Sequence, residues 1–383
     1  MSLSSLIATG TKVWLDGVDP DELEKNHAWG ITGATSNPII ISKIAGRGRF
    51  DDRIRELIEQ GLSDSEIAWA LADELVTSAQ KMFLPAWQRT AGNDGYVSFE
   101  LDPLIEDEAA GLDRPQRVKR YLELGEKWAA GHKNRMIKVP ASPAGLDALE
   151  ALAAAGVTIN VTLMFTDRQY RIARDAIWRG VKRSKHGLHD FKSVYSIFVS
   201  RVDVYTEKHA SELSPAAQGM VGIVNARRIW RENQEFWKDK GLRLQQEIVF
   251  ASTGVKQPGD PPDKYVEALA GGDVQTNPSA TNEAVEQSAK TYACHIDETP
   301  SASVVGEIEK KVDMASLERV LMDEGIDKFV EPQTALLRLI AHKRASLGSL
   351  LQRPVEPEIM GDHERKYQLL GDRLVINHGG PNT

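Results

Sequence analysis

One lysine in the sequence has surroundings in which an amine can act as a nucleophile. Lys138 lies in the apolar run MIKVP (136–140), which is typical of an inner β-strand. Burial disfavours the ammonium form, and an amine that loses its proton near neutral pH can attack a carbonyl and form a Schiff base. A lysine whose side chain extends to solvent at the rim of a barrel, or one that forms a structural ion pair, would give the same pattern. Asp16 and Glu100 are carboxylates that can lie beside it, as ion-pair partners or as groups that transfer protons.

Other polar side chains interrupt apolar runs, or follow them, in the same way. Asn37 follows the run TGAT, Asn160 and Thr162 lie within VTINVTLMF, and Ser196 lies within VYSIFVS. Polar groups inside apolar strands are costly unless they have partners. Their repeated placement near strand ends therefore indicates a shared polar site.

Two basic residues could bind an anion near that site. Arg201 follows one predicted strand and Lys256 follows the next, with Ser252 and a small-residue turn in ASTGVK between them. Arginine and lysine beside loop amides can hold a phosphate. Ordinary solvation of a loop is the better explanation for any one of these residues taken alone.

Strands that end beside one another must position these side chains. Short apolar runs alternate with longer segments whose apolar residues recur three and four apart, as in parallel βαβ units. The predicted strands are VWLD (13–16), TGAT (32–35), YVSFEL (96–101), MIKVP (136–140), VTINVTLMF (157–165), VYSIFVS (194–200), EIVFAS (247–252) and DVQT (273–276).

Eight such units predict an α/β fold, a closed (β/α)8 barrel with its reactive groups at the carboxyl ends of the strands. An open doubly wound sheet is the alternative. The sequence contains neither a GxGxxG motif nor a Walker loop that would indicate a nucleotide site.

Two regions are additional to the roughly 250 residues that a typical (β/α)8 barrel needs. We expect about two helices in residues 41–95, and further helix in 318–347 that packs on the barrel. We therefore expect residues 1–350 to form a single barrel domain with covering helices, followed by a polar tail at 351–383.

Composition narrows the class of protein. Of 383 residues, 41% are hydrophobic and 27% charged, the balance of a soluble globular protein. The net charge of −8 gives no general reason to bind nucleic acid or an acidic membrane. With Cys294 as the single cysteine, no internal disulfide is possible, and we expect a cytoplasmic protein. His186 and His189 have a spacing compatible with a metal, but they lie in a polar, basic connection, so we expect no metal site there.

The ordered motifs resemble the transaldolase family, specifically its longer bacterial and plant-type subgroup. The resemblance covers roughly residues 12–347 and rests on VWLD, TGATSNP, DGYVSFELDP, MIKVPAS, INVTLMF, SIFVSRVD and ASTGVK. It implies a (β/α)8 barrel that performs class I aldol chemistry without a metal or organic cofactor. It also implies small sugar phosphates as binding partners, and family members occur as monomers and homodimers.

The resemblance also implies roles for the residues that match the family's motifs. Lys138 matches the Schiff-base lysine, and Asp16 matches the aspartate that takes the proton from the C4 hydroxyl. Glu100 matches the group that moves protons through a water beside Thr162.

Further matches concern binding of the substrate. Asn37, Asn160 and Ser196 match residues that hold the dihydroxyacetone fragment, and Arg201 matches the main phosphate ligand. The fragment remains bound until an aldose phosphate accepts it, which makes the enzyme a transferase of the non-oxidative pentose phosphate pathway.

The sequence departs from the shorter transaldolases at the second phosphate ligand. Those enzymes have an arginine just after the serine that matches Ser252, whereas this segment reads Ser-Thr-Gly-Val-Lys and leaves Lys256 as the substitute. A lysine offers a point charge where arginine offers a planar fork. The segment QTNPSATNEA also departs from the subgroup, and no site residue is assigned from it.

Three alternatives remain at this stage. A fructose-6-phosphate-aldolase-like enzyme would release free dihydroxyacetone, but that branch is shorter and has glutamine and tyrosine where this chain has Glu100 and Phe198. A transaldolase for an unusual phosphorylated or sulfonated ketose would use the same anion ligands. A non-catalytic barrel should have lost at least one of Asp16, Glu100, Lys138 and Thr162, and all four are present.

Overall fold

Eight parallel strands form a closed barrel in the computed structural model of the chain, which describes residues 2–185, 187 and 190–351. Each strand pairs with the next one in sequence, and β1 pairs with β8 to close the barrel. The strands are β1 (Lys12–Leu15), β2 (Gly33–Thr35), β3 (Val97–Glu100), β4 (Arg135–Pro140), β5 (Ile159–Met164), β6 (Ser193–Phe198), β7 (Glu247–Ala251) and β8 (Val274–Asn277). The predicted (β/α)8 barrel is confirmed, and the open sheet is excluded.

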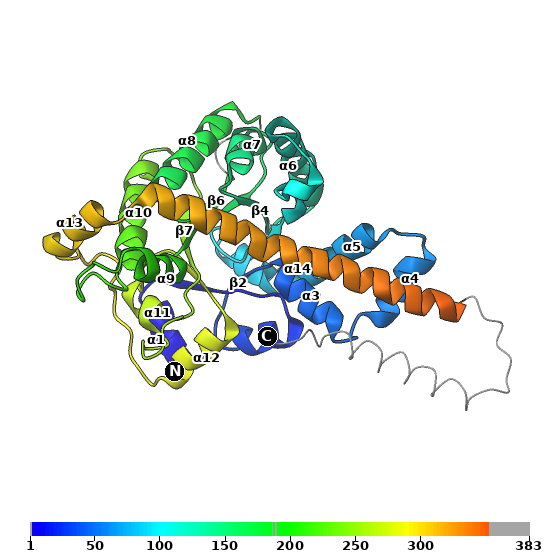
Figure 1. Cartoon of the computed structure of the whole chain (residues 1–383), viewed down its shortest axis with the longest axis horizontal. Helices are drawn as coiled ribbons and strands as arrows, with labels where there is room; N and C mark the ends of the chain where they lie inside the picture. Colours follow the sequence, from blue (N-terminus) through cyan, green and yellow to red (C-terminus); the bar gives the residue numbers. More distant parts are fainter. Residues whose placement is uncertain (1, 186, 188–189, 352–383) are drawn as a thin grey trace, which may run out of the picture.

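Helices surround the barrel and connect its strands (Figure 1). They are α1 (Ser2–Ala8), α2 (Pro20–His27), α3 (Pro38–Gly46), α4 (Asp51–Glu59), α5 (Asp64–Arg89), η1 (Pro103–Ile105), η2 (Glu108–Ala110), α6 (Arg114–Ala129), α7 (Pro143–Ala154), α8 (Asp167–Arg183), α9 (Ser200–His209), α10 (Val221–Trp237), α11 (Lys264–Ala268), α12 (Ser279–Gln287), α13 (Ala302–Lys311) and α14 (Met314–Leu351).

Local sequence signals start several of these helices where a strand ends. Asn37 caps α3 by accepting a hydrogen bond from the Ile40 amide at 3.1 Å, and Pro38 occupies the first helical position. Thr166 and Gln169 form a reciprocal capping box at the start of α8. These caps fix each turn at the carboxyl end of the barrel, where the polar side chains were predicted to gather.

The expectation of about two helices in residues 41–95 is confirmed, because α4 and α5 lie wholly within this stretch. Three helices separate β2 from β3, because Asn37 and Pro38 start α3 before residue 41. The chain then turns at Gly48 and again at Gly61, both of which have positive φ. These turns divide a largely helical stretch into α3, α4 and α5.

The barrel has an inner cluster that is distinct from the layer between strands and helices. The inner cluster consists of Trp14, Tyr96, Met136, Val194, Val249 and Val274. Trp14 fills so much of this space that a Cβ on Gly33 would lie 2.6 Å from its indole ring. The glycine of TGAT is therefore required by the tryptophan of VWLD on the neighbouring strand.

The long helix α14 crosses the barrel and continues along α3, α4 and α5 (Figure 1). Near its start, Glu318 accepts hydrogen bonds from Thr166 and pairs with Arg168 at the beginning of α8. Near its other end, Arg344 pairs with Asp64 at 2.6 Å and Lys343 pairs with Asp51. The predicted helix at 318–347 thus packs on the barrel and is held at both ends.

Two findings bear on other expectations. Among the described residues, no helix is long and apolar enough to cross a membrane. His186, His189 and the tail from residue 352 onward lie outside the part of the chain that the structure describes.

Candidate active site

A small cavity of about 160 Å³ opens among the carboxyl ends of the strands. It is lined by Asp16, Thr35, Asn37, Ile39, Lys138, Thr162, Ser196, Phe198, Arg201, Ala251, Ser252, Gly254, Lys256, Thr276, Pro278 and Phe329. Nine of the eleven predicted site residues are in this lining. The other two, Glu100 and Asn160, contact it through hydrogen bonds to Lys138 and Ser196.

Lys138 is buried at the base of this cavity, with 5% of its surface exposed. Its Nζ donates to Glu100 Oε2 at 3.0 Å and to the Ser36 carbonyl at 3.2 Å. The ring centroid of Phe329, on α14, lies 5.5 Å from the same nitrogen. An ammonium has three donors and only two acceptors are near, so one side of this nitrogen faces the cavity and the aromatic ring.

Glu100 has an environment that favours its protonated form. Burial raises the pKa of Glu100 above its ordinary value, and the charge of Asp16 adds to this. The attraction of Lys138 acts in the opposite direction and only partly offsets the burial. The carboxyl can therefore exchange a proton with groups beside it, as acid–base chemistry requires.

Asp16 lies one residue beyond β1, on the opposite side of the cavity from the β5 residues. Its Oδ1 accepts hydrogen bonds from Thr35 at 3.2 Å and from Asn37 at 3.4 Å. Thr35 also lies 3.2 Å from Thr276 of β8. These contacts fix the carboxylate in place from β2, on the neighbouring side of the barrel.

A hydrogen-bonded row of polar side chains crosses the barrel below the cavity. Ser196 of β6 donates to Asn160 of β5 at 2.7 Å, and Asn160 donates to Ser98 of β3 at 2.9 Å. The row fixes the orientation of the Asn160 amide. By contrast, the buried Thr162 Oγ1 has no hydrogen-bond partner among the described residues, although it lines the cavity.

The basic side of the cavity is formed by α9 and by the turn after β7. The guanidinium of Arg201 lies 4.9 Å from the Phe198 ring centroid, and its buried Nη1 has no partner within the described chain. Burial lowers the pKa of Arg201, although nearby carboxylates, Asp16 foremost, act in the opposite direction. Ser252 adopts a left-handed φ of 55° and its Oγ lies 2.9 Å from that of Ser200. This strained turn brings Gly254 and Lys256 to the cavity.

Sequence reasoning missed part of the lining. Thr35 and Thr276 end TGAT and DVQT, so their position at strand ends was a usable signal. The carbonyl of Ser36 is a backbone group that no side-chain pattern reveals. Phe329 lies on α14, far downstream in the sequence of Lys138, which it approaches in the fold. Nothing in its local sequence indicates this contact.

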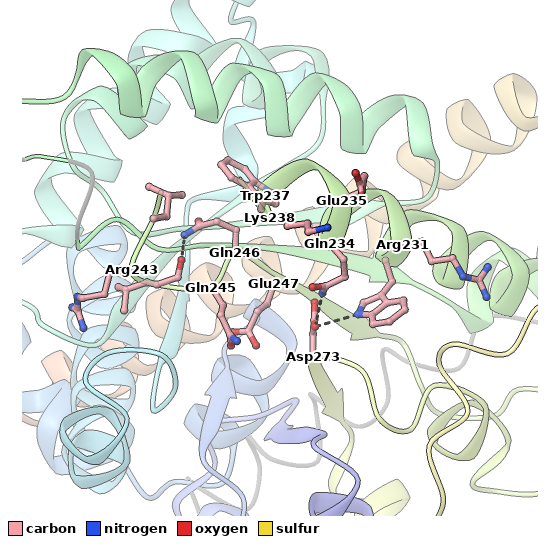
Figure 2. A pocket seen from close by; sticks show the side chains of 13 residues that line it. Arg231, Gln234, Glu235, Trp237, Lys238, Arg243, Gln245, Gln246, Glu247 and Asp273 are labelled. Carbon is pink, nitrogen blue, oxygen red and sulfur yellow. Dashed lines mark hydrogen bonds between the residues drawn. The ribbon is translucent and has the colours of Figure 1, made fainter. Parts of the chain in front are cut away.

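A larger hollow of about 470 Å³ lies at the other end of the barrel, around Glu247 and Asp273 (Figure 2). Two of its acidic groups, Glu247 and Asp273, already have partners. Glu247 pairs with Lys12 at 2.6 Å and also with Lys192. Asp273 accepts hydrogen bonds from Trp230 at 3.1 Å and from Gln234 at 3.0 Å, as Figure 2 shows. The smaller cavity contains the buried Lys138 together with an unpartnered hydroxyl on Thr162 and an unpartnered guanidinium nitrogen on Arg201, and it is therefore the better candidate for chemistry.

The described residues of the two hollows form no cluster that could hold a metal ion. The described residues contain no group of three or more His, Cys, Asp or Glu side chains that could hold a metal ion. The groups available at the smaller cavity are an amine, two carboxyls, hydroxyls and cations. They suit acid–base and covalent chemistry on a polar, anionic molecule.

Comparisons with known proteins agree with this arrangement. The model of the transaldolase/fructose-6-phosphate aldolase family matches residues 13–340. A transaldolase of Thermobifida fusca is 32% identical over 90% of this chain and 98% of its own length. The transaldolase of Mycolicibacterium paratuberculosis is 33% identical over 88% of this chain and 95% of its own. One from Mycobacterium tuberculosis is 31% identical, with 92% and 98% covered. The chain belongs to the transaldolase/fructose-6-phosphate aldolase family.

Proposed function

We propose that the protein is a transaldolase, which moves a dihydroxyacetone unit from a ketose phosphate to an aldose phosphate through a Schiff base on Lys138. The observation that carries this proposal is the buried Lys138–Glu100 pair at 3.0 Å, at the base of a cavity that also exposes Asp16 and Arg201. Relatives named transaldolase support the same function. Sedoheptulose 7-phosphate and fructose 6-phosphate are the proposed donors.

The first step in this proposal is attack of the neutral Lys138 amine on the C2 ketone of the donor. The carbonyl oxygen takes up a proton as the carbinolamine forms, and the carbinolamine then loses water to give the iminium. Glu100 is placed to give and take these protons because its carboxyl lies 3.0 Å from the Lys138 nitrogen. Thr162, whose hydroxyl has no partner in the described chain, would hold the water that connects Glu100 to the substrate.

Asp16 serves the second step, cleavage of the C3–C4 bond. It takes the proton of the C4 hydroxyl as the bond breaks, and the electron pair of the bond moves into the iminium to give an enamine. The aldose phosphate then leaves. Asp16 is held by Thr35 and Asn37, so the carboxylate is positioned before the substrate arrives.

The enamine keeps the three-carbon unit on the enzyme until an acceptor arrives. Asn160 and Ser196 would bind its hydroxyls, together with Asn37. The enamine attacks the acceptor aldehyde, the new alkoxide takes the proton back from Asp16, and hydrolysis of the iminium releases the new ketose phosphate. Phe198 and Phe329 form apolar walls of the cavity, which limits the access of water to the enamine.

Arg201 would bind the phosphate of either sugar, with Ser252 and Lys256 as further ligands. Its Nη1 atom is buried and unpaired within the described residues, and a phosphate oxygen would supply the missing acceptor. A ketose with a sulfonate group would offer the same acceptors. The anion ligands therefore set the class of substrate, while the shape of the loops sets the sugar.

Assembly and compartment follow from the same proposal. We place the enzyme in the cytoplasm as a monomer or homodimer, with residues 1–350 as its barrel domain. The exposed and unpaired Cys294 suits a reducing compartment.

Borohydride trapping tests the proposed function. Incubation with fructose 6-phosphate and sodium borohydride should reduce the Schiff base and leave a stable three-carbon adduct on Lys138, located by peptide mass spectrometry. Lys192 is an internal control, because it is equally buried and also paired with a glutamate. An unmodified Lys138 would refute the mechanism. Rapid release of free dihydroxyacetone without an acceptor would identify an aldolase instead.

A further inference from the structure

A second hollow of about 310 Å³ adjoins the candidate active site on its basic side. It lies between α9 and α14, which contact each other. Arg201, Tyr205 and Lys208 of α9 face it, and so do Glu324 and Lys328 of α14. Residues three, four and seven apart share one face of a helix, so each helix presents a single stripe to this groove.

Positive charge dominates the groove. Lys328 pairs with Glu324 at 3.0 Å, which leaves Lys208 and Lys256 with no carboxylate partner among the described residues. The protein as a whole has a net charge of −8, and most of its other surface cations with a defined position are in ion pairs. Unpaired cations grouped in one hollow attract anions.

The groove is connected to the candidate active site through shared residues. Arg201 and Lys256 line both hollows. Gly325 of α14 explains how the helix can lie so near, because a Cβ at this position would be 2.9 Å from Leu163 and 3.6 Å from Arg201 Nη1. An anion in the groove would therefore already touch one or both of the residues proposed to hold the substrate phosphate.

We propose that the groove between α9 and α14 is an outer phosphate subsite, in which Lys208, Lys256 and Lys328 receive the phosphate group of a sugar phosphate and pass it to Arg201. This inference rests on the proposed function for the identity of the substrate. The ligand class is a phosphate monoester, because the cations are few and enclose one small space. The sugar follows its phosphate into the cavity and reaches Lys138.

The role of such a subsite is in capture of the substrate and not in the chemical steps. Clefts lined by charge of one sign raise association rates by about 10–1000-fold, and salt weakens the effect. Removing charge from the groove should therefore lower kcat/KM for phosphorylated acceptors while leaving kcat nearly unchanged. An acceptor without a phosphate should not respond.

A pair of double variants tests this with matched charge. Lys208→Gln with Lys328→Gln removes two positive charges from the groove. Lys133→Gln with Lys238→Gln removes two from exposed positions at the opposite end of the barrel, where Lys238 borders the larger hollow (Figure 2). We expect kcat/KM for glyceraldehyde 3-phosphate to fall by about 10-fold in the groove variant only. With unphosphorylated glyceraldehyde, both variants should behave as the wild type does.

Three kinetic outcomes would overturn the proposal. They are an unchanged kcat/KM in the groove variant, an equal loss in the control variant, or an equal loss with unphosphorylated glyceraldehyde. The slope of log kcat/KM against ionic strength should also become shallower in the groove variant, and an unchanged slope would contradict a steering role.

A binding measurement separates failure of this inference from failure of the proposed function. Inorganic phosphate should slow acetylation of Lys208 and Lys328 in the wild-type protein, read by mass spectrometry, and should leave Lys133 unaffected. Protection in a protein without transaldolase turnover would retain the anion subsite and reject the function. Turnover without protection would reject the subsite and retain the function.

Discussion

Two buried lysine–glutamate pairs lie at opposite ends of the same barrel and have different surroundings. At the carboxyl end, Glu100 contacts one lysine, Lys138, and has the negative charge of Asp16 nearby. At the amino end, Glu247 contacts both Lys192 and Lys12. Burial and pairing are thus common to both ends, and the number of lysines in contact with the glutamate differs.

Because of these surroundings, the pKa values of the two carboxyls shift in opposite directions. Burial raises the pKa of Glu100, and its single lysine does not cancel the effect. Burial would also raise the pKa of Glu247, but Lys192 and Lys12 together outweigh it and hold the pKa below its ordinary value. Burial and neighbouring charges therefore shift the pKa upward at one end of the barrel and downward at the other.

The two buried lysines also differ, in the number of hydrogen-bond acceptors around each nitrogen. The Nζ of Lys192 donates to Glu247, to the Gln245 carbonyl at 2.5 Å and to the Asn93 carbonyl at 3.4 Å, which uses all three of its donors. Lys138 has two such acceptors and faces a cavity. A buried lysine with a full set of acceptors stabilises the fold, whereas one that borders a cavity can react.

Exchanging each lysine for methionine should give the largest contrast. Lys138→Met should abolish transfer and leave the fold intact, because it removes the nucleophile. Lys192→Met should retain activity per folded molecule and lose about 3 kcal/mol of stability, because Glu247 keeps only Lys12 as a partner. Turnover assays and urea unfolding measure the two effects. Full activity in Lys138→Met would remove the distinction between the ends.

Replacing each glutamate with glutamine should also distinguish the two ends of the barrel, with a smaller effect. Glu100→Gln should reduce kcat by about 10²–10⁴-fold, because it removes a proton-transfer group and keeps a hydrogen-bond acceptor for Lys138. Glu247→Gln serves as the matched control and should affect unfolding and not kcat. A normal kcat in Glu100→Gln would show that another group moves the proton.

The smallest expected effect concerns Asp273, which should make the free energy of unfolding depend on pH. Burial and the nearby charge of Glu247 raise its pKa from 3.8 to about 6. A carboxyl with a raised folded-state pKa contributes stability that is fully present below its unfolded pKa, near 4, and is lost as the pH rises through about 6. Urea unfolding of wild type and Asp273→Asn between about pH 4 and pH 6.5 measures it. The advantage of the wild type should shrink as the pH rises, and a constant or growing advantage would contradict the shift.

Much of the site was predictable because a parallel barrel gathers strand ends. Once VWLD and MIKVP are strands of one barrel, Asp16 and Lys138 must lie at the same end, whatever their separation in sequence. The alternating pattern also located all eight strands to within about two residues of the bounds observed. The largest differences, of two residues, are at the start of β5 and at the end of β6.

Other features could not be predicted from local patterns. Phe329 reaches Lys138 only because α14 crosses the barrel, held by Arg168 at one end and Arg344 at the other. The groove beside the active site likewise needs α9 and α14 to lie together. Contacts between elements far apart in sequence depend on packing, and helical periodicity does not specify them.

The sequence by itself determined the barrel, the strand ends and the identity of the one lysine whose neighbouring motifs match a family. It did not show which charges surround Lys138 or Lys192 in the fold, because neither lysine lies next to its glutamate partner in the sequence. Tertiary structure decided this by placing two lysines on Glu247 and one on Glu100. The physical reason is that the charge state of a buried group depends on the charges and solvent around it in space.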